Sequence, residues 1–340
     1  MKDKNSKTQT PPPKSPAKEK TPMSQYINEF LEYCEIGKNQ SRRTLANYNH
    51  YLSRFDQFSQ SQGARHPKNI DQELVRRYRL YLNRLGGDDG QKKLKLISQN
   101  YHLIALRAFL KYLTKMDVPT MAPEKIELPK NPGRQVEFLE PEELGRLFAA
   151  AKNEPDELLR LRDLAILETL FSTGLRVSEL AGLRRETVNV ERGEFTVRGK
   201  GSKLRVVFLS PEAAASIKKY LARRRDNNQA LFVSHSTVGN TVDLEIDSQG
   251  NIESGKPQGL TPRSIQRVIK KYCRAAGIIK KVSPHTLRHS FATDLLRNGA
   301  DIRSVQAMLG HSSITTTQIY THITNEGLRD IHRKFHKKTK

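Results

Sequence analysis

The sequence predicts a mainly α-helical protein with one small antiparallel β-sheet, divided into a helical N-terminal domain and a larger mixed C-terminal domain. Apolar residues recur at helical spacing through residues 23–117 and again after residue 139. The period changes to strand-like alternation only between residues 186 and 209. Prolines separate the two helical regions, and a chain of 340 residues is long enough for two domains of ordinary size.

The N-terminal region combines a tail with four helical stretches. Residues 1–22 contain lysine, serine, threonine and three consecutive prolines, a composition that cannot offset its own ordering entropy, so they are predicted to be a disordered basic tail. Helical apolar stripes then run from Tyr26 to Leu31, from Leu45 to Phe55, over about 71–85 and over about 97–115. Residues 23–117 are therefore expected to form a compact four-helix domain.

Residues 118–138 are predicted to be an extended linker, because their prolines remove backbone donors and resist helix continuation. The second domain begins with Glu140-Pro141, where proline and the acids that follow suit the positive end of a helix dipole. Short strands are expected at 187–190, 194–197 and 204–209, and a polar surface loop or hairpin insertion at 234–260. The expected helices cover about 141–152, 157–173, 211–225, 261–276, 284–299, 301–309, 312–320 and 324–336.

The charge balance indicates a polyanionic partner. Lysine and arginine total 59 against 36 acidic residues, which leaves a formal charge of +23. A globular protein tolerates this self-repulsion most readily when it binds a polyanion, so nucleic acid is the leading candidate. An anionic membrane surface is the alternative, but no amphipathic basic helix or lipidation signal stands out.

Basic residues are spread over the four predicted N-terminal helices, interleaved with tyrosine and asparagine, and few acids offset them. A solvated basic surface is one interpretation, and contact with double-stranded DNA is the favoured one. The residues expected to bind DNA in this domain are Arg42, Arg43, Arg76, Arg77, Lys92, Lys93 and Arg107.

Three absences in the sequence guide the functional class. No apolar run approaches the ~18 to 20 residues of a transmembrane helix, and the N-terminus develops no apolar signal segment, so a cytoplasmic location without membrane contact is expected. Cys34 and Cys273 lie far apart and suit neither a disulfide framework nor a zinc knuckle. Because no Walker-type phosphate loop is present either, no cofactor or metal is expected.

The C-terminal region carries a set of side chains suited to phosphoryl transfer. His285 and Arg288 stand three apart on a predicted helix, which places an imidazole and a guanidinium on one face. Arg176 follows a glycine break where a new helix begins, and His311 and Tyr320 come later in the chain. For Arg176 alone, a helix cap or a surface salt bridge is the alternative.

A metal site is the alternative for the histidines. His285 and His289 stand four apart and could bind a metal from one helix face, with His311 or His322 as a third ligand. No cysteine or carboxylate accompanies them at ligand spacing, and the two arginines would repel a cation. His289 and His322 are therefore expected to have structural roles.

The chemistry of a phosphodiester explains the choice of these residue types. An enzyme that uses no metal must supply positive donors to the nonbridging oxygens, and Arg176 and Arg288 can each bind two oxygens while remaining charged. His311 can add a donor. Tyr320, with an ordinary pKa of about 10, needs a base or nearby positive charge before it can attack, and His285 is the expected base.

The motifs His285-x-x-Arg288, Leu309-Gly310-His311 and Tyr320, with Gly174-Leu175-Arg176 upstream, resemble the signature of the tyrosine recombinase (phage integrase) family, and Xer-type recombinases most of all. The resemblance covers about residues 23–336. It implies an N-terminal SAM-like core-binding domain, a catalytic domain over residues 139–323, and DNA cleavage through a 3′-phosphotyrosine intermediate.

The resemblance also assigns residues that composition does not single out. Lys200 matches the family's mobile hairpin lysine, which would protonate the leaving 5′ oxygen, and Lys203 is the fallback and an expected DNA contact. Glu179 matches an acidic position that would orient a neighbouring histidine or arginine, while a plain helix-surface role is equally open. Residues 324–340, with an apolar stripe, would dock on a neighbouring subunit as an exchange helix of a homotetramer.

The biological setting stays open between chromosome-dimer resolution and integration or excision of a mobile element. The resemblance implies strand exchange between two sites in a tetrameric synapse, with association with the nucleoid and a host accessory protein or DNA translocase as a further partner. A type IB topoisomerase is the rival within the same chemistry. A DNA-binding architectural protein is the rival outside it, but that interpretation needs one of the matched residues to be missing, and none is.

Overall fold

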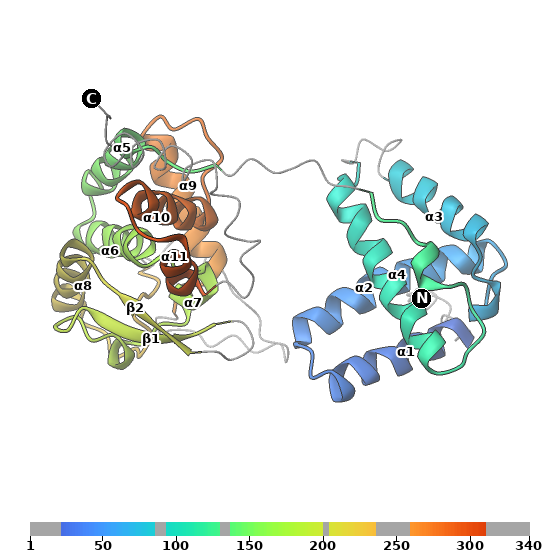
Figure 1. The fold of residues 1–340 in the computed structure, drawn as a ribbon. Helices are drawn as coiled ribbons and strands as arrows, with labels where there is room; N and C mark the ends of the chain where they lie inside the picture. Colours follow the sequence, from blue (N-terminus) through green and yellow to red (C-terminus); the bar gives the residue numbers. More distant parts are fainter. Residues whose placement is uncertain (1–21, 86–92, 130–136, 200–203, 236–258, 311–340) are drawn as a thin grey trace, which may run out of the picture. The chain divides into compact units, whose positions relative to one another are not determined.

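The computed structural model describes residues 22–85, 93–129, 137–199, 204–235 and 259–310, and the chain divides into two compact units, Met1–Arg134 and Gln135–Lys340 (Figure 1). Helices dominate both units, and the second unit also contains a two-stranded antiparallel sheet. The predicted fold class is confirmed. Among the described helices, none has both the length and the apolar character that a membrane span requires.

The described part of the first unit has four α-helices: α1 (Pro22–Glu32), α2 (Arg42–Ser61), α3 (Gln72–Arg84) and α4 (Leu96–Lys115). A π-helical turn, Tyr33–Gly37, extends α1. Polar side chains fix two helix starts, because the Ser41 hydroxyl accepts from the Thr44 amide at 3.3 Å and the Asp71 carboxylate accepts from the Leu74 amide at 2.7 Å. The four helices match those that the apolar stripes predict.

The core of the first unit is rich in aromatic side chains and includes a buried histidine. Arg54 donates to His102 Nε2 at 3.3 Å, and a guanidinium can only donate, so the ring proton lies on Nδ1 and faces the Tyr78 hydroxyl at 3.1 Å. Burial, and then the charge of Arg54, lowers the pKa of His102 to about 4. His102 is therefore neutral at physiological pH and serves as a structural residue.

The first part of the predicted linker packs against the first unit. Met121 and Ile126 are buried in its core, on either side of a 3-10 turn at Pro123–Lys125. Burial of these two apolar side chains favours packing of this segment on the first unit. The prolines alone do not predict this packing. The compact unit consequently extends past residue 117, where the sequence pattern places its end.

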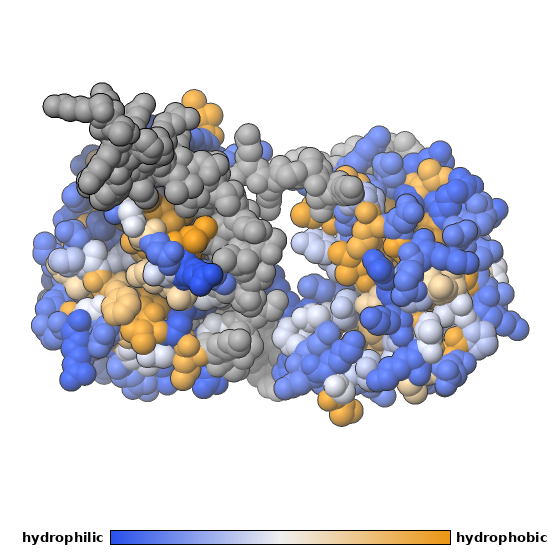
Figure 2. Space-filling view, viewed as in Figure 1, coloured by the Kyte–Doolittle hydropathy of each residue, from blue (hydrophilic) through white to orange (hydrophobic). Residues whose placement is uncertain are grey.

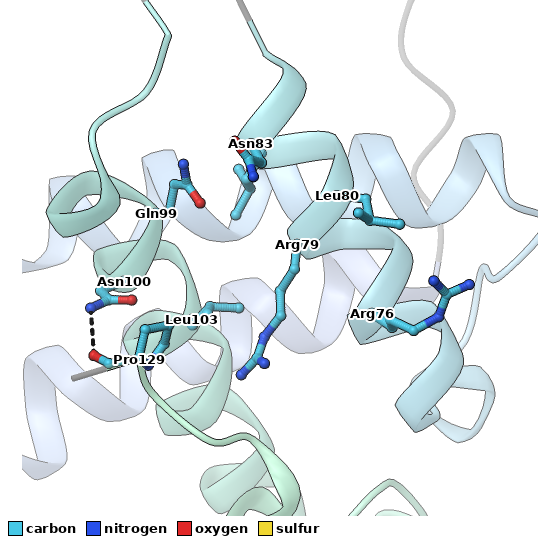
Figure 3. Close-up of a pocket in the computed structure, with 9 residues that line it drawn as sticks. Arg76, Arg79, Leu80, Asn83, Gln99, Asn100, Leu103 and Pro129 are labelled. Atoms are coloured by element: carbon cyan, nitrogen blue, oxygen red, sulfur yellow. Dashed lines mark hydrogen bonds between the residues drawn. The ribbon is translucent and has the colours of Figure 1, made fainter. Parts of the chain in front are cut away.

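A cavity of about 220 Å³ marks this contact (Figure 3). Side chains of α3 and α4 line it, together with Pro129. Arg79 of α3 donates to the Glu127 carbonyl, and Asn100 of α4 donates to the Pro129 carbonyl at 3.1 Å. Side-chain donors from α3 and α4 thus hold residues 127–129 against these two helices.

The second unit has seven described helices: α5 (Pro141–Lys152), α6 (Glu157–Thr173), α7 (Val177–Ala181), α8 (Pro211–Arg223), α9 (Pro262–Ala275), α10 (Pro284–Arg297) and α11 (Ile302–Leu309). Proline occupies the first helical position of α5, α8, α9 and α10. That position needs no amide donor, and proline pre-sets the helical φ angle, so each proline fixes a helix start.

The sheet is a hairpin of β1 (Glu194–Arg198) and β2 (Leu204–Phe208), with Phe195 opposite Val207. The third strand predicted at residues 187–190 is wrong, because Asn189 makes only an isolated bridge to Glu194. The Asn189 side-chain oxygen instead accepts from the backbone amides of Glu191 and Arg192, at 3.1 and 2.9 Å, and so closes a turn. The chain therefore turns where the alternation of valines suggests a strand.

One face of the hairpin packs inward and the other is exposed. Phe195 and Val207 are buried, whereas Leu204, Val206 and Phe208 on the opposite face are 67%, 48% and 51% exposed. Figure 2 shows apolar side chains among mainly hydrophilic ones on the visible surface of the unit that carries this hairpin. The period of two predicted from the sequence thus holds for the two strands that form.

A small apolar cluster joins α6, α10 and α11 in the second unit. Phe291 and Leu296 of α10 pack with Val305 and Leu309 of α11, and Phe171 of α6 covers them. Figure 1 shows α10 beside α6, with α11 next to α10. This packing brings together the C-terminal ends of α6 and α11, and the predicted catalytic arginines lie there.

Candidate active site

Gly174 lets three helices approach one another. It ends α6 in the left-handed conformation, with φ at +58°, and its amide donates to the Leu170 carbonyl at 3.1 Å. A Cβ atom at Gly174 would lie 2.5 Å from Phe291 Cδ1 and 3.0 Å from Leu309 Cδ2. Glycine is therefore required here both for the φ angle and for the close packing of α6 against α10 and α11.

Arg288 joins the ends of α6 and α11 from its position on α10. Its side chain donates from Nη1 to the Gly174 carbonyl and from Nη2 to the Leu309 carbonyl, both at 2.6 Å. Arg288 is only 4% exposed. A buried guanidinium fixed at both ends cannot change orientation freely, so Arg288 presents a rigid positive charge at this junction.

Arg176 approaches the same junction from the start of α7. Its Nη1 donates to Glu179 Oε1 at 2.8 Å, and its Nη2 donates to the Gly310 carbonyl at 3.3 Å. The side chain is 28% exposed, so solvent or a ligand can reach it. The structure thus brings Arg176 and Arg288 to the successive carbonyl groups of Leu309 and Gly310, immediately before His311 in the sequence.

Glu179 lies between two arginines. Arg205 of β2 donates to both of its carboxylate oxygens, at 3.0 and 2.7 Å, and Arg176 donates to both as well, through its backbone amide and its side chain, each at 2.8 Å. The Glu179 side chain is 8% exposed, which excludes a plain helix-surface role. Burial raises its pKa, but the hydrogen bonds from Arg205 and Arg176 outweigh burial and bring the pKa to about 2.

Arg205 is the member of this cluster that the sequence motifs do not identify. In the strand Leu204–Phe208 it has the same parity as Val207, which is buried. An arginine on the inward face of a strand needs a buried hydrogen-bonding or charged partner. The parity of Arg205 in the strand could therefore have indicated that it belongs to a buried cluster. The alternation alone could not show that the partner is Glu179.

The ionisation of Glu179 predicts how stability depends on pH. Its folded pKa of about 2 lies below its ordinary value of 4.5, so the carboxylate stabilises the fold fully above about pH 4.5, and this stabilisation is lost as the pH falls toward 2. We expect Glu179→Gln to lower the free energy of unfolding by roughly 2 to 3 kcal/mol near neutral pH and by much less near pH 3. Urea unfolding at a series of pH values measures this difference, and a difference that stays constant would contradict the prediction.

The two described histidines of α10 differ in exposure. His285 lies in the first turn and is exposed, while His289 is half-buried. Arg288 lies on the same helix as His285 but is buried. The three-residue spacing thus places the two side chains on neighbouring parts of the helix surface, with His285 exposed to solvent and Arg288 inside the unit. Within the described ranges, no group of three histidine, cysteine or acidic side chains is placed to hold a metal ion.

Several predicted site residues lie outside the described residues: Lys92, Lys200, Lys203, His311 and Tyr320. The described neighbours of three of them are nevertheless informative. Residues 200–203 connect β1 to β2, and Arg205 ties β2 to the arginine cluster. The chain passes to His311 directly from Gly310, whose carbonyl accepts from Arg176.

The predicted DNA-binding residues of the first unit that can be placed are exposed. Arg42 and Arg43 begin α2, Lys93 precedes α4, and Arg107 lies on the outer face of α4. Arg76 and Arg77 are exposed too, but both pair with Glu73, at 2.7 and 2.9 Å. One carboxylate shared by two arginines leaves a net positive charge on this part of α3.

Two family models match the chain. The model of the phage integrase N-terminal SAM-like domain matches residues 27–116, and the model of the phage integrase family matches residues 137–326. The chain belongs to the phage integrase family of tyrosine recombinases. The first model lies within the four-helix unit of this recombinase, and the second model covers the arginine cluster.

The recombinase is most informatively compared with Xer proteins. It is 36% identical to the tyrosine recombinase XerD of Chlorobaculum tepidum, over 93% of this chain and 97% of that protein. It is 34% identical to XerC of Pelobacter propionicus, over 94% of this chain and 97% of that protein. The recombinase is thus an Xer-like enzyme of site-specific recombination, which cleaves and rejoins DNA.

A solved structure shows the same fold. The XerH site-specific recombinase, bound to palindromic difH substrate in a post-cleavage complex, is 23% identical and superimposes with a TM-score of 0.64. The match covers 92% of this chain and 85% of that chain. Both units of the recombinase therefore have the folds of this family.

Proposed function

We propose that the recombinase attacks a DNA phosphodiester with Tyr320 and forms a 3′-phosphotyrosine bond. The observation that carries this proposal is the convergence of Arg176 and Arg288 on the carbonyl groups of Leu309 and Gly310, next to His311 in sequence. Two guanidiniums held at one junction form a preorganised group of donors for nonbridging phosphate oxygens. The partial exposure of Arg176 leaves this group accessible to DNA.

The proposed step balances through two proton transfers. The Tyr320 hydroxyl gives its proton to His285, and its oxygen attacks phosphorus while Arg176, Arg288 and His311 bind the nonbridging oxygens. The bond from phosphorus to the 5′ oxygen breaks, and that oxygen takes a proton from Lys200, or from Lys203 if the hairpin register is shifted. A 5′-hydroxyl from another strand then reverses the step. The phosphotyrosine conserves the energy of the broken bond, so the reaction requires no nucleotide cofactor.

Duplex DNA is the proposed partner of both units. The XerH relative is bound to its DNA substrate, and the exposed Arg42, Arg43 and Arg107 of this recombinase offer positive charge on helices of the first unit. We assign the same role to Arg76, Arg77, Lys92, Lys93 and Lys203. Such phosphate contacts make binding weaken steeply as salt rises.

The proposed assembly is a homotetramer that pairs two DNA sites, with residues 324–340 docking on a neighbouring subunit. The similarity to recombinases named XerD and XerC leaves two proposed settings. One is chromosome-dimer resolution, with association with the nucleoid and a host accessory protein or a DNA translocase as a further partner. The other, integration or excision of a mobile element, would use the same chemistry. The DNA sequence bound in cells distinguishes these settings.

Covalent trapping tests the proposed function. DNA that stays attached to the protein through denaturation is sequenced from cells, and an oligonucleotide with that site and a nick that traps the adduct is then offered to the purified protein. We expect a covalent adduct with a free 5′-hydroxyl and with the DNA on the peptide that contains Tyr320, as measured by mass spectrometry. Attachment to another residue would refute the assigned nucleophile. An adduct formed without exchange between paired sites would favour a topoisomerase.

A further inference from the structure

We propose that Arg205 is a positioning residue for DNA cleavage, which holds Glu179 so that Arg176 is aimed at the scissile phosphate. This inference rests on the proposed function. Arg205 contacts both oxygens of Glu179, and Arg176 contacts the same two oxygens from the other side. Each carboxylate oxygen therefore bridges the two arginines.

The burial of this contact limits its freedom. The side chains of Arg205 and Glu179 are 9% and 8% exposed, whereas that of Arg176 is 28% exposed. The buried Arg205–Glu179 pair thus forms a rigid support. Arg176 is the member of the cluster that a ligand can reach. Rigid support of this kind maintains the geometry that transition-state stabilisation requires.

The charges of the cluster also indicate that Arg205 supports the binding of a phosphate by Arg176. Two arginines and one carboxylate leave a net charge of one positive, which is available to a phosphate. Without Arg205, Arg176 and Glu179 would neutralise each other, and the carboxylate would be free to turn toward Arg176 alone. Arg205 therefore keeps Glu179 from occupying the guanidinium that the phosphate needs.

The position of Arg205 links three segments that carry proposed catalytic residues. It lies on β2, two residues after the end of the segment 200–203 that contains Lys200 in the sequence, and it contacts Glu179 in α7, three residues after Arg176. Its side chain also fills the space beside Gly310, where a Cβ atom would lie 3.0 Å from Arg205 Cδ. One side chain thus contacts the start of α7 and the end of α11, next to His311.

A double-mutant cycle tests this inference on the full-length protein with the trapping oligonucleotide. We expect Arg205→Met to slow adduct formation at saturating protein on the order of 100-fold, while the Kd for DNA changes little. Adding Arg205→Met to Glu179→Gln should cause little further loss, because both changes remove the same support. The matched control is Arg192→Gln, which removes an exposed charge from the segment leading into β1 and should keep the wild-type rate.

Two results would overturn the inference: a wild-type cleavage rate in Arg205→Met, or losses that multiply in the double variant. If Arg205→Met does not fold, Arg205→Lys keeps the charge but not the two-oxygen contact, and we expect a loss on the order of 10-fold at unchanged Kd. A wild-type rate for Arg205→Lys would then overturn the inference.

A measurement without DNA separates failure of the inference from failure of the proposed function. Carbon-13 NMR of the Glu179 carboxyl should show a raised pKa in Arg205→Met, because only Arg176 then opposes the effect of burial. If no tyrosine adduct forms in the wild-type protein, the proposed function fails whatever the NMR titration shows. If adducts form and the Glu179 pKa is unchanged, the proposed positioning role alone is refuted.

Discussion

Replacing Arg288 with methionine should remove covalent DNA cleavage and destabilise the C-terminal unit. Arg288 donates to the carbonyl groups of Gly174 and Leu309 at 2.6 Å from a buried position, and methionine leaves both acceptors without that donor. We expect the free energy of unfolding to fall by roughly 2 to 4 kcal/mol. The rate of adduct formation should fall by about 10² to 10³-fold, which is the loss typical of removing one hydrogen-bond donor to the transition state.

Arg297→Met is the matched control on the same helix. Arg297 pairs with Glu140 at 2.7 Å, and both side chains are about 40% exposed, so its loss should change stability by at most ~1 kcal/mol and leave cleavage intact. Urea unfolding and adduct trapping measure the two effects separately. Equal stability of the Arg288 and Arg297 variants would show that the two carbonyl contacts contribute nothing.

Gly174→Ala should be the most damaging single-methyl change in the described part of the second unit. The φ angle of +58° costs an alanine about 1 kcal/mol, and its Cβ would overlap Phe291 at 2.5 Å, for a total of roughly 2 to 4 kcal/mol in unfolding free energy. The overlap also pushes α6 away from α10, so cleavage should fall together with stability. Thermal unfolding and adduct trapping report the two losses.

Gly277→Ala separates the two causes of this expected loss. Gly277 has nearly the same φ angle, +63°, but no atom lies within 4 Å of its would-be Cβ. We expect only the backbone cost of about 1 kcal/mol and full activity. The overlap argument would be wrong if both alanine variants lost the same stability. It gains support if Phe291→Leu restores part of the stability of the Gly174 variant.

The sequence predicts helix bounds well where a residue type fixes them physically. Residues 141–152 and 157–173 agree with α5 and α6, because proline begins the first helix and Gly174 ends the second. The pattern was misleading at residues 187–190, where the side chain of Asn189 captures the backbone amides of a turn. Hydrogen bonds from a side chain to nearby backbone amides compete with the backbone pairing of a strand. The alternation of apolar residues does not predict such hydrogen bonds.

The candidate site could be predicted only in part. Motif spacing identifies Arg176 and Arg288, and the structure brings both to the end of α11. Arg205 could not be assigned because its partner, Glu179, lies 26 positions away, and no local pattern connects a strand to that helix. The contacts of Arg288 with backbone carbonyl groups could not be predicted either, because every residue has a carbonyl group and the residue types do not show which one accepts.

The anchoring of the chain on both sides of the unit boundary has a consequence for affinity. Asn100 of the first unit donates to the Pro129 carbonyl at 3.1 Å, and Lys280 of the second unit donates to the Phe138 carbonyl at 3.3 Å. Between these two contacts the covalent connection consists of residues 130–137. In the proposed function both units bind one duplex, so once one unit is bound, the length of this connection sets the effective concentration of the other unit at the same duplex. Avidity, and with it the occupancy of a single recombination site, thus depends on a few residues that carry no chemistry themselves.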